Sequence, residues 1–187
     1  MNMNMNMNFN NVNIQPIRIE DIELMRKWRN NENDKGVFFN NKYITKEEQE
    51  NWYEKYKNNI NDKMFMIYYD EIPVGTIALY NIDFENNIAE FGRLLIGNTI
   101  FRGKNIAFRA TKLLCEYGFS KLNLNKIILE VYKKNINAFN LYKKIGFKVV
   151  KEKTINNKQV FLMELNKNKI WFSKQLNNMY LAAFYIN

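Results

Sequence analysis

The sequence contains no histidine among its 187 residues. Without an imidazole, the chain cannot form serine–histidine triads, cysteine–histidine dyads or most zinc sites. A general base must therefore be a carboxylate, a lysine, a tyrosine or a water molecule. Cys115 is the one cysteine, so an intramolecular disulfide framework is excluded too, and we expect the protein to work in the reducing cytoplasm.

Long apolar runs are also missing. No stretch approaches the roughly 20 apolar residues that a membrane helix requires, and the first residues do not resemble a secretory signal peptide. We therefore expect no membrane partner. Basic residues are in excess, because 28 Lys and Arg against 19 Asp and Glu give a net charge of +9. Such a charge is typical of a solvated surface or of a protein that attracts an anionic partner. Nucleic acid is not the expected partner, since the sequence has no zinc-finger, KH or RRM-like signature.

The length and an apolar fraction of 47% predict one globular domain. Residues 1–13 begin with the repeat MNMNMNMN, and we expect this low-complexity tail to be disordered. The domain itself is predicted to span residues 14–165. Residues 166–187 form a C-terminal extension with apolar side chains at helical spacing, which we expect to pack on the domain or on the partner subunit of a homodimer.

Hydrophobic periodicity predicts seven strands and four helices in the order β-α-α-β-β-β-α-β-α-β-β, a mixed α/β fold. The predicted strands are Ile14–Ile19, Met64–Tyr69, Val74–Ile82, Ile88–Gly97, Lys126–Val131, Phe147–Lys151 and Gln159–Leu165. Thr45 and Glu48 form a predicted capping box at the start of the second helix.

The segment Arg102–Ala107 (RGKNIA) reads as a turn that opens the third helix and binds phosphate. A helix N-terminus offers free N–H groups and the positive end of the helix dipole. Gly103 allows close approach of the backbone, and Asn105 is the non-glycine residue best suited to a left-handed conformation. The predicted phosphate-binding residues are Arg102, Gly103, Lys104, Asn105, Ile106 and Ala107.

The segment Asn135–Phe147 (NINAFNLYKKIGF) contains a second pattern. Asn135 is placed to cap the fourth helix, and Gly146 to end it as a left-handed C′ residue. Tyr142 follows Asn135 by two helical turns, so both side chains are expected on one face of the helix.

Together these two segments resemble the acetyl-CoA site of the GNAT acetyltransferase superfamily. That family shows Gln/Arg-x-x-Gly-x-Gly/Ala at its phosphate turn, and here Asn105 stands where the family usually has glycine. It also commonly shows Asn-x-x-Ala-x-x-x-Tyr-x-x-x-Gly-Phe, which this chain matches in full from Asn135 to Phe147. The resemblance covers about Ile14 to Leu165.

The resemblance implies a fold and a reaction. The expected fold has a central, mostly antiparallel sheet, splayed at the cofactor site, with helices on both faces. The expected reaction moves an acetyl group from acetyl-CoA to a primary amine by direct attack in a ternary complex, without a metal. In such a site Asn135 faces the cofactor, and the Tyr142 hydroxyl protonates the thiolate of CoA. Leu95 and Ile96, at the end of a strand that splays from Lys126–Val131, would offer backbone N–H groups to the pantetheine and the thioester.

Two carboxylates compete for the role of general base. Glu130 lies in the middle of the apolar strand IILEV, and a Glu in this context resembles the proposed base of bacterial ribosomal-protein alanine acetyltransferases. Its alternative role is an outward-facing residue in a salt bridge. Glu90, at the start of the strand expected to contact the thioester, is the second candidate. Arg93 is flanked by apolar residues and is expected either to bind an anionic substrate or to face solvent.

The acceptor is predicted from the N-terminal region. Trp28, Arg29 and Asn30, followed by Trp52 after a capped helix, are similar to the RimJ/RimL-like branch, and in particular to bacterial enzymes that acetylate nucleotide-linked 4-amino sugars. Arg29 and Asn30 would hold phosphate or sugar hydroxyls, or simply end a helix. The alternatives are acetylation of a protein N-terminus or of an antibiotic amine, and a degenerate domain that only binds CoA or a partner.

Overall fold

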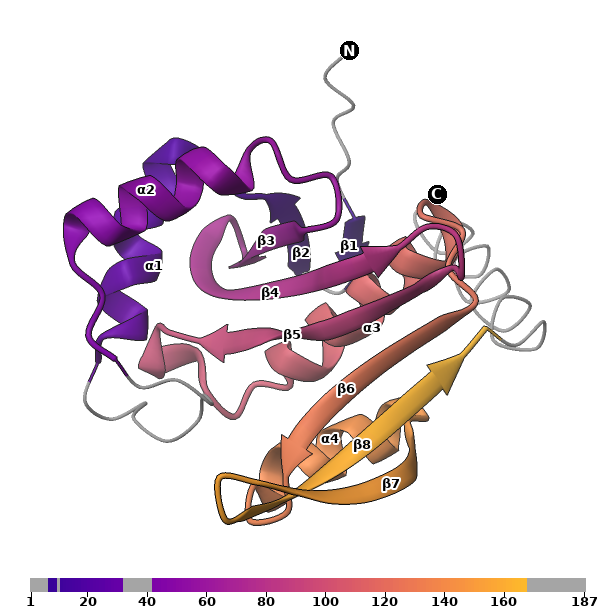
Figure 1. Cartoon of the computed structure of the whole chain (residues 1–187). Helices are drawn as coiled ribbons and strands as arrows, with labels where there is room; N and C mark the ends of the chain where they lie inside the picture. The colour runs from indigo at the N-terminus through magenta and orange to yellow at the C-terminus, as the bar shows by residue number, and fades with distance from the viewer. Residues whose placement is uncertain (1–6, 10, 32–41, 168–187) are drawn as a thin grey trace, which may run out of the picture.

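The computed structural model describes residues 7–9, 11–31 and 42–167 (Figure 1). These residues form one eight-stranded sheet in the order β1-β2-β3-β4-β5-β6-β8-β7. Its strands are β1 Met7–Phe9, β2 Val12–Pro16, β3 Lys63–Tyr69, β4 Ile72–Asp83, β5 Ile88–Ile96, β6 Lys126–Tyr132, β7 Lys148–Ile155 and β8 Lys158–Asn166. The α-helices are α1 Ile22–Arg29, α2 Lys46–Tyr56, α3 Ile106–Ser120 and α4 Ile136–Ile145, and short 3₁₀ helices occupy Ile19–Asp21 and Thr99–Phe101.

The sheet is antiparallel except between β5 and β6, which run parallel. Their pairing starts at Ile88 with Lys126 and ends at Glu90 with Ile128. Beyond this point the two strands diverge and leave a V-shaped gap, which is plain in Figure 1. The splayed, mostly antiparallel sheet that the resemblance implied is therefore confirmed.

A β-bulge interrupts β5 beside this gap. Thr76 of β4 pairs with Leu95 and Ala78 pairs with Gly92, so Arg93 and Leu94 together face one residue of β4. Arg93 takes the left-handed conformation, with φ of 52°. The preceding residue, Gly92, does not have a positive φ.

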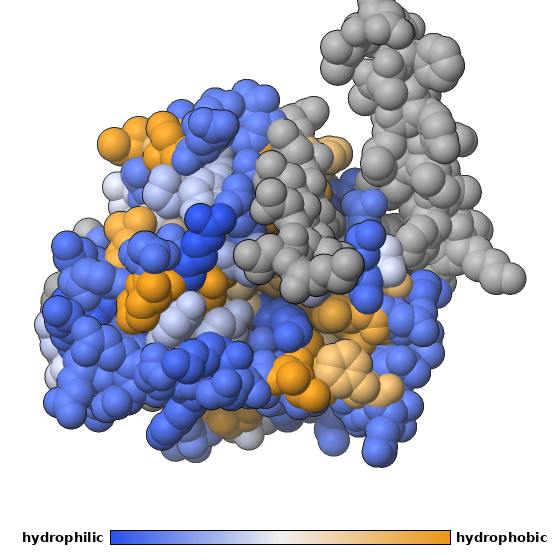
Figure 2. All heavy atoms as spheres, turned by 90° about the horizontal axis from the view of Figure 1, so that it is seen from above, coloured by the Kyte–Doolittle hydropathy of each residue, from blue (hydrophilic) through white to orange (hydrophobic). Residues whose placement is uncertain are grey.

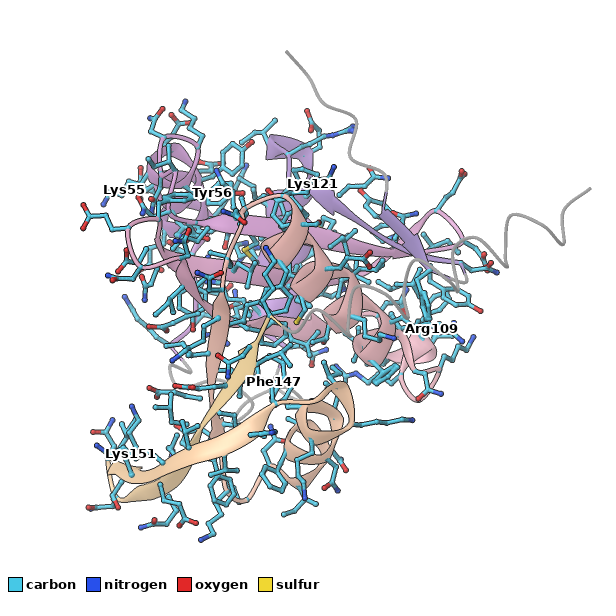
Figure 3. The ribbon with its side chains drawn as sticks, turned by 90° about the vertical axis from the view of Figure 1, so that its right-hand side faces the viewer. Lys55, Tyr56, Arg109, Lys121, Phe147 and Lys151 are labelled. Carbon is cyan, nitrogen blue, oxygen red and sulfur yellow. The ribbon has the colours of Figure 1, made fainter. Side chains whose placement is uncertain are left out.

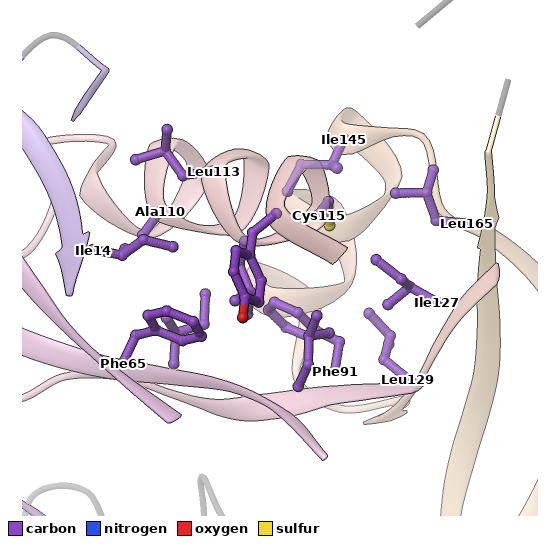
Figure 4. Close-up of a cluster of buried hydrophobic side chains, with 14 of the residues drawn as sticks. Ile14, Phe65, Phe91, Ala110, Leu113, Cys115, Ile127, Leu129, Ile145 and Leu165 are labelled. Carbon is purple, nitrogen blue, oxygen red and sulfur yellow. The ribbon is translucent and has the colours of Figure 1, made fainter. Parts of the chain in front are cut away.

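Helices cover both faces of the sheet, so two apolar cores form. The larger core lies under α3 and α4, where Phe65, Phe91 and Ile127 of the sheet face Ala110 and Cys115 of α3 (Figure 4). Burial raises the pKa of the Cys115 thiol well above its usual range, so this thiol packs as a small apolar side chain. The smaller core lies on the other face and is centred on Met25, Trp28, Met66, Ala78 and Leu95.

Polar side chains fix α1 and α2 over the smaller core. The Thr45–Glu48 capping box forms as predicted: the Thr45 hydroxyl accepts from the Glu48 N–H at 3.1 Å, and the Glu48 carboxylate accepts from the Thr45 N–H at 2.8 Å. The Tyr56 hydroxyl accepts a hydrogen bond from the Met64 N–H at 3.1 Å, which ties the end of α2 to β3.

The N-terminal segment is more ordered than the sequence suggested. Disorder was expected up to residue 13, but β1 pairs with β2, and Val12 is fully buried. Phe9 and Val12 both pack on the larger core. Burial of their apolar side chains stabilises this segment, although the repeat before it is low in complexity. Residues 1–6 and the expected extension beyond residue 167 lie outside the described residues.

The described surface is predominantly polar. The face seen from above is mainly hydrophilic, with separate apolar groups between charged side chains (Figure 2). Within the described parts of the chain, no helix is long and apolar enough to cross a membrane. Figure 3 places Lys151, on the β6–β8–β7 side of the gap, at the opposite end of the molecule from Lys55 and Tyr56 of α2.

Candidate active site

A cavity of ≈ 420 Å³, the splay cavity, occupies the gap between β5 and β6. It receives side chains from both diverging strands, from α4 and its N-cap, from β4 and from the end of α1. The residues that line it are Arg29, Tyr80, Glu90, Phe91, Gly92, Arg93, Leu94, Glu130, Val131, Tyr132, Asn135, Ala138 and Tyr142. Sequence positions as distant as 29 and 142 therefore meet at the splay.

Tyr142 enters the cavity from the α4 side of the sheet. Its side chain is buried, and its ring packs edge-on against Phe91 at 5.5 Å and Phe147 at 5.9 Å. Asn135, which caps α4 by accepting a hydrogen bond from the Ala138 N–H at 3.2 Å, lines the same cavity. Burial raises the pKa of Tyr142 far above its usual value, so the hydroxyl keeps its proton at neutral pH. Among the described residues this hydroxyl has no hydrogen-bond partner.

The two carboxylates enter from the opposite face of the sheet. Glu90 lies between Ala89 and Phe91, and both neighbours belong to the core under α3; strand alternation therefore turns Glu90 towards α1 and α2. The same alternation applies to Glu130 on β6. The Glu130 carboxylate forms an ion pair with Lys153 of β7. Within residues 7–9, 11–31 and 42–167, Glu90 forms no ion pair. Glu130 therefore lines the cavity and also forms the salt bridge of its alternative role.

Arg93 forms part of the cavity wall and has a partner that the sequence did not suggest. Its Nη1 donates to both carboxylate oxygens of Asp62 at 2.8 Å, and the Asp62 side chain is buried. The Arg93 carbonyl accepts a hydrogen bond from the Thr76 hydroxyl at 3.0 Å. The bulge is therefore fixed from both sides. Asp62 follows a run of asparagines in a surface turn, so no periodicity marks it as a buried ion-pair partner.

A second cavity of ≈ 290 Å³ lies on the α1–α2 face and meets the first at Arg29 and Arg93, which line both. It is lined by Met25, Arg29, Ile44, Gln49, Trp52, Met64, Thr76, Arg93 and Leu95. Burial lowers the pKa of Arg29 to about 10, so its guanidinium is still positive at neutral pH. None of the described lining residues is a carboxylate.

The turn before α3 has the geometry expected of a phosphate site. Gly103 and Asn105 both adopt left-handed backbones, with φ of 81° and 58°, and α3 begins at Ile106. Asn105 thus takes the conformation predicted for it, in place of the usual glycine. Arg102 Nε donates to the Ile96 carbonyl at 2.9 Å, which ties the turn to the end of β5. The Lys104 ammonium lies 4.8 Å from the centre of the Phe101 ring.

The two cavities bring together seven of the residues singled out in the sequence, whereas the turn from Arg102 to Ala107 lines neither cavity. The seven are Arg29, Glu90, Arg93, Leu95, Glu130, Asn135 and Tyr142. Leu95 lines the second cavity, whereas Ile96 packs against the larger core. Of the three predicted substrate-binding residues, Arg29 and Arg93 line both cavities and Asn30 lines neither. Its side-chain amide donates to the Ile44 carbonyl at 2.7 Å and accepts from the Ile44 N–H at 2.9 Å. Asn30 therefore holds the approach to α2 and has its hydrogen-bonding groups engaged there.

Tyr80 also lines the splay cavity, and it was not identified from the sequence. It lies in an apolar strand, where a tyrosine has the pattern of an ordinary core residue. Its ring lies over Gly92, and the Arg93 guanidinium carbon stands 4.7 Å from the ring centre. Among the described residues no group of three potential ligands is placed to hold a metal ion.

The residues present fit acetyl-CoA. The α3 turn offers backbone N–H groups and basic side chains for phosphates, and the edge of β5 beyond Glu90 is unpaired with β6. A strand edge without its neighbour leaves N–H groups available to a ligand.

Comparisons with known proteins agree with this reading. The model of the GNAT acetyltransferase domain family matches residues 11–148. The chain is 32% identical over 138 residues to the spermidine N(1)-acetyltransferase of Escherichia coli (strain K12), covering 74% of this chain and 73% of that protein. It is 30% identical over 140 residues to the acetyltransferase PseH of Campylobacter jejuni, covering 75% of this chain and 85% of that protein.

Solved structures show the same fold. The spermidine N-acetyltransferase of Vibrio cholerae, in complex with CoA and spermine, matches with a TM-score of 0.78 at 24% identity, over 83% of this chain and 95% of that one. A dodecameric structure of the V. cholerae enzyme matches with a TM-score of 0.72 at 22% identity, over 86% of this chain and 96% of that one. These findings do not distinguish a RimJ/RimL-like branch. The chain belongs to the GNAT acetyltransferase family and is an acetyl-CoA-dependent N-acetyltransferase that acts on amines.

Proposed function

We propose that the acceptor is an amine carried on a neutral or anionic molecule, and that a nucleotide-linked amino sugar is the best candidate. The observation that supports this most is the second cavity, which has two arginines and no carboxylate among its described lining residues. The charge of Arg93 is balanced by Asp62, so the positive charge that disfavours a polyamine, itself a chain of positive charges, is that of Arg29. Phosphates and sugar hydroxyls accept hydrogen bonds from a guanidinium.

The shape of this cavity is consistent with the same class of acceptor. Trp52 offers a flat apolar surface on which a sugar or base ring packs, and Gln49 adds an amide that both donates and accepts hydrogen bonds. The acceptor amine would extend past Arg29 and Arg93 into the splay cavity, where the carboxylates Glu90 and Glu130 lie. Carboxylates thus line the cavity where an ammonium would arrive and are absent from the described lining of the second cavity, while Arg29 and Arg93 line both.

The reaction assigns a role to each end of the site. The α3 turn from Arg102 to Ala107 would bind the phosphates of CoA, and the β5 edge and Asn135 would hold the pantetheine. Acetyl-CoA supplies the thioester whose acetyl group is transferred. Tyr142 holds the proton that the leaving thiolate requires, because burial keeps its hydroxyl neutral. A carboxylate of the splay cavity takes the proton of the acceptor ammonium.

A polyamine is the second candidate, since the E. coli relative at 32% identity is a spermidine acetyltransferase. Release of CoA thiol with acetyl-CoA and a UDP-linked 4-amino sugar, spermidine, or a peptide with a free N-terminus separates the candidates. We expect the highest kcat/KM for the nucleotide sugar, and a KM for it that rises with salt through screening of its phosphates.

Arg29→Gln tests the cavity itself. It should raise KM for the nucleotide sugar about tenfold or more, the loss expected of one charge-assisted hydrogen bond, and leave KM for acetyl-CoA unchanged. Lys27→Gln is the matched control, because Lys27 is an exposed cation on the same helix. Efficient acetylation of spermidine, with no transfer to any nucleotide sugar, would reject the proposed acceptor and leave the enzyme class intact.

A further inference from the structure

Tyr80 occupies a central position in the splay cavity. It is the cross-strand partner of Glu90 in the β4–β5 pair, on the same face of the sheet. A Cβ atom at position 92 would lie 3.0 Å from the Tyr80 hydroxyl oxygen, closer than side chains normally approach. The glycine therefore leaves the space through which the tyrosine crosses β5. Its hydroxyl reaches the strand edge that faces β6.

The surroundings keep this hydroxyl protonated and hold it in place. Burial raises the pKa of Tyr80 to about 12, and the negative charge of the nearby Glu90 adds to the shift. A phenol with this pKa is neutral at physiological pH, so towards a carboxylate it acts as a donor. The Arg93 guanidinium above the ring, itself tied to Asp62, limits the movement of the side chain.

The two carboxylates of the cavity are not equivalent. The Glu130 carboxylate is engaged in an ion pair with the Lys153 ammonium of β7. Glu90 has no cationic partner of this kind among the described residues, and its neighbour is the Tyr80 hydroxyl. An acceptor ammonium entering the gap thus meets one carboxylate that is engaged and one that is available.

We propose that Tyr80 is a positioning residue for Glu90, and that Glu90 takes the acceptor proton. The Tyr80 hydroxyl donates to one carboxylate oxygen and directs the carboxylate into the gap. In the step itself an N–H bond of the ammonium breaks, an O–H bond forms on Glu90, and the nitrogen keeps the electron pair. The hydroxyl of Tyr80 retains its own proton throughout.

This inference concerns the transfer step and goes beyond the identity of the acceptor. It makes Glu90 the base, where the sequence placed Glu130 first, and gives Glu130 with Lys153 the role of closing the cavity wall. The charged and titratable groups that line the cavity around the pair are Arg93 of β5, Glu130 and Tyr132 of β6, Arg29 of α1 and Tyr142 of α4.

Double-mutant cycles test the assignment with whichever amine the wild-type enzyme acetylates fastest. Tyr80→Phe keeps the ring over Gly92 and removes only the hydroxyl. We expect kcat/KM to fall about 10- to 100-fold at neutral pH, at the lower end of what acid–base groups contribute. In a Glu90→Gln background Tyr80→Phe should lower kcat/KM less than twofold, because the carboxylate that the hydroxyl positions is already absent. In a Glu130→Gln background it should keep its full effect.

The pH profile is a readout that a purely structural role would not move. In Tyr80→Phe the acid limb of kcat/KM should shift to higher pH, since the ionised carboxylate loses a donor, and CoA affinity by calorimetry should not change. Tyr117→Phe is the matched control, because Tyr117 is buried against Phe65 in the larger core. The proposal would be overturned if Tyr80→Phe kept full kcat/KM, or if the losses in kcat/KM from Tyr80→Phe and Glu90→Gln simply multiplied in the double variant. It would also be overturned if the effect of Tyr80→Phe disappeared in the Glu130→Gln background and not in the Glu90→Gln background.

Discussion

At the scale of single residues, Tyr142 is held by aromatic packing, so its hydroxyl can be removed without disturbing its position. We expect Tyr142→Phe to lower kcat by roughly 10²–10⁴-fold, the contribution of a general acid. The edge-on contacts with Phe91 and Phe147 persist in the variant, so CoA affinity and melting temperature should change little. Steady-state kinetics and calorimetry give both values, and an unchanged kcat with chemistry rate-limiting would exclude Tyr142 from the mechanism.

Asp62 is the residue on which the bulge of β5 depends. Asp62→Asn leaves the Arg93 guanidinium without its counter-charge, and we expect a loss of about 1–3 kcal/mol in unfolding free energy. This is less than for a fully buried pair, because the Arg93 side chain is 34% exposed. KM for the acceptor should rise as well. Glu54→Gln, which breaks the exposed pair with Lys57, is the control and should change neither quantity.

Side chains that repeat a family spacing or a capping pattern were predictable from the sequence. Asn135 caps its helix as expected, and Tyr142 lies in the cavity where the spacing placed it. Tyr80 and Asp62 were not predictable, because each acquires its role from a residue on another strand. No local pattern reports that a tyrosine will cross a glycine on β5, or that a turn aspartate will meet an arginine 31 positions later.

At the scale of elements, the turn before α3 is the part of the site most dependent on one helix end. Ala107→Glu places a carboxylate in the first turn of α3. The helix dipole stabilises that charge, so the melting temperature of the variant without ligand should not fall. The phosphates of CoA would be repelled, and the rise in melting temperature on adding CoA should disappear.

Asn51→Glu adds the same charge to an exposed position of α2 and is the control for this prediction; its thermal shift with CoA should equal that of the wild type. Equal CoA affinities of Ala107→Glu and the wild type would show that the phosphates of CoA do not bind at the α3 turn.

The elements themselves followed the sequence closely, because apolar periodicity and caps are local signals. The divergence of β5 from β6 was expected only through the family resemblance. The pairing ends after three positions, and the bulge at the left-handed Arg93 follows it on β5. The contact that holds Arg93 is non-local, because its partner is Asp62. A basic residue in an apolar strand carries no signal for such a bulge, whereas the neighbouring glycine does.

At the scale of the whole molecule, the splay divides the sheet into a β1–β5 part with α1, α2 and α3, and a β6–β8–β7 part with α4 (Figure 1). A ligand held by the α3 turn and by Asn135 would bridge the two. We therefore expect CoA to slow amide hydrogen exchange both at residues 106–109 and at residues 135–142, measured by mass spectrometry. The β1–β2 pair, far from the gap, serves as the internal control. Protection confined to α3 would contradict binding across the splay.

The left-handed turns have a consequence for the unfolded chain. The chain has only seven glycines, and its described residues with positive φ include Asn11, Asn81, Asn87, Asn105, Asn123, Asn156 and Asn157. Asparagine samples fewer backbone conformations than glycine before folding, so fixing each of these turns costs less conformational entropy. Glycine at these positions would relax the folded turns and at the same time favour the denatured ensemble. The reversals that bring β4, β5 and β6 together are thus partly prepared before any core has formed.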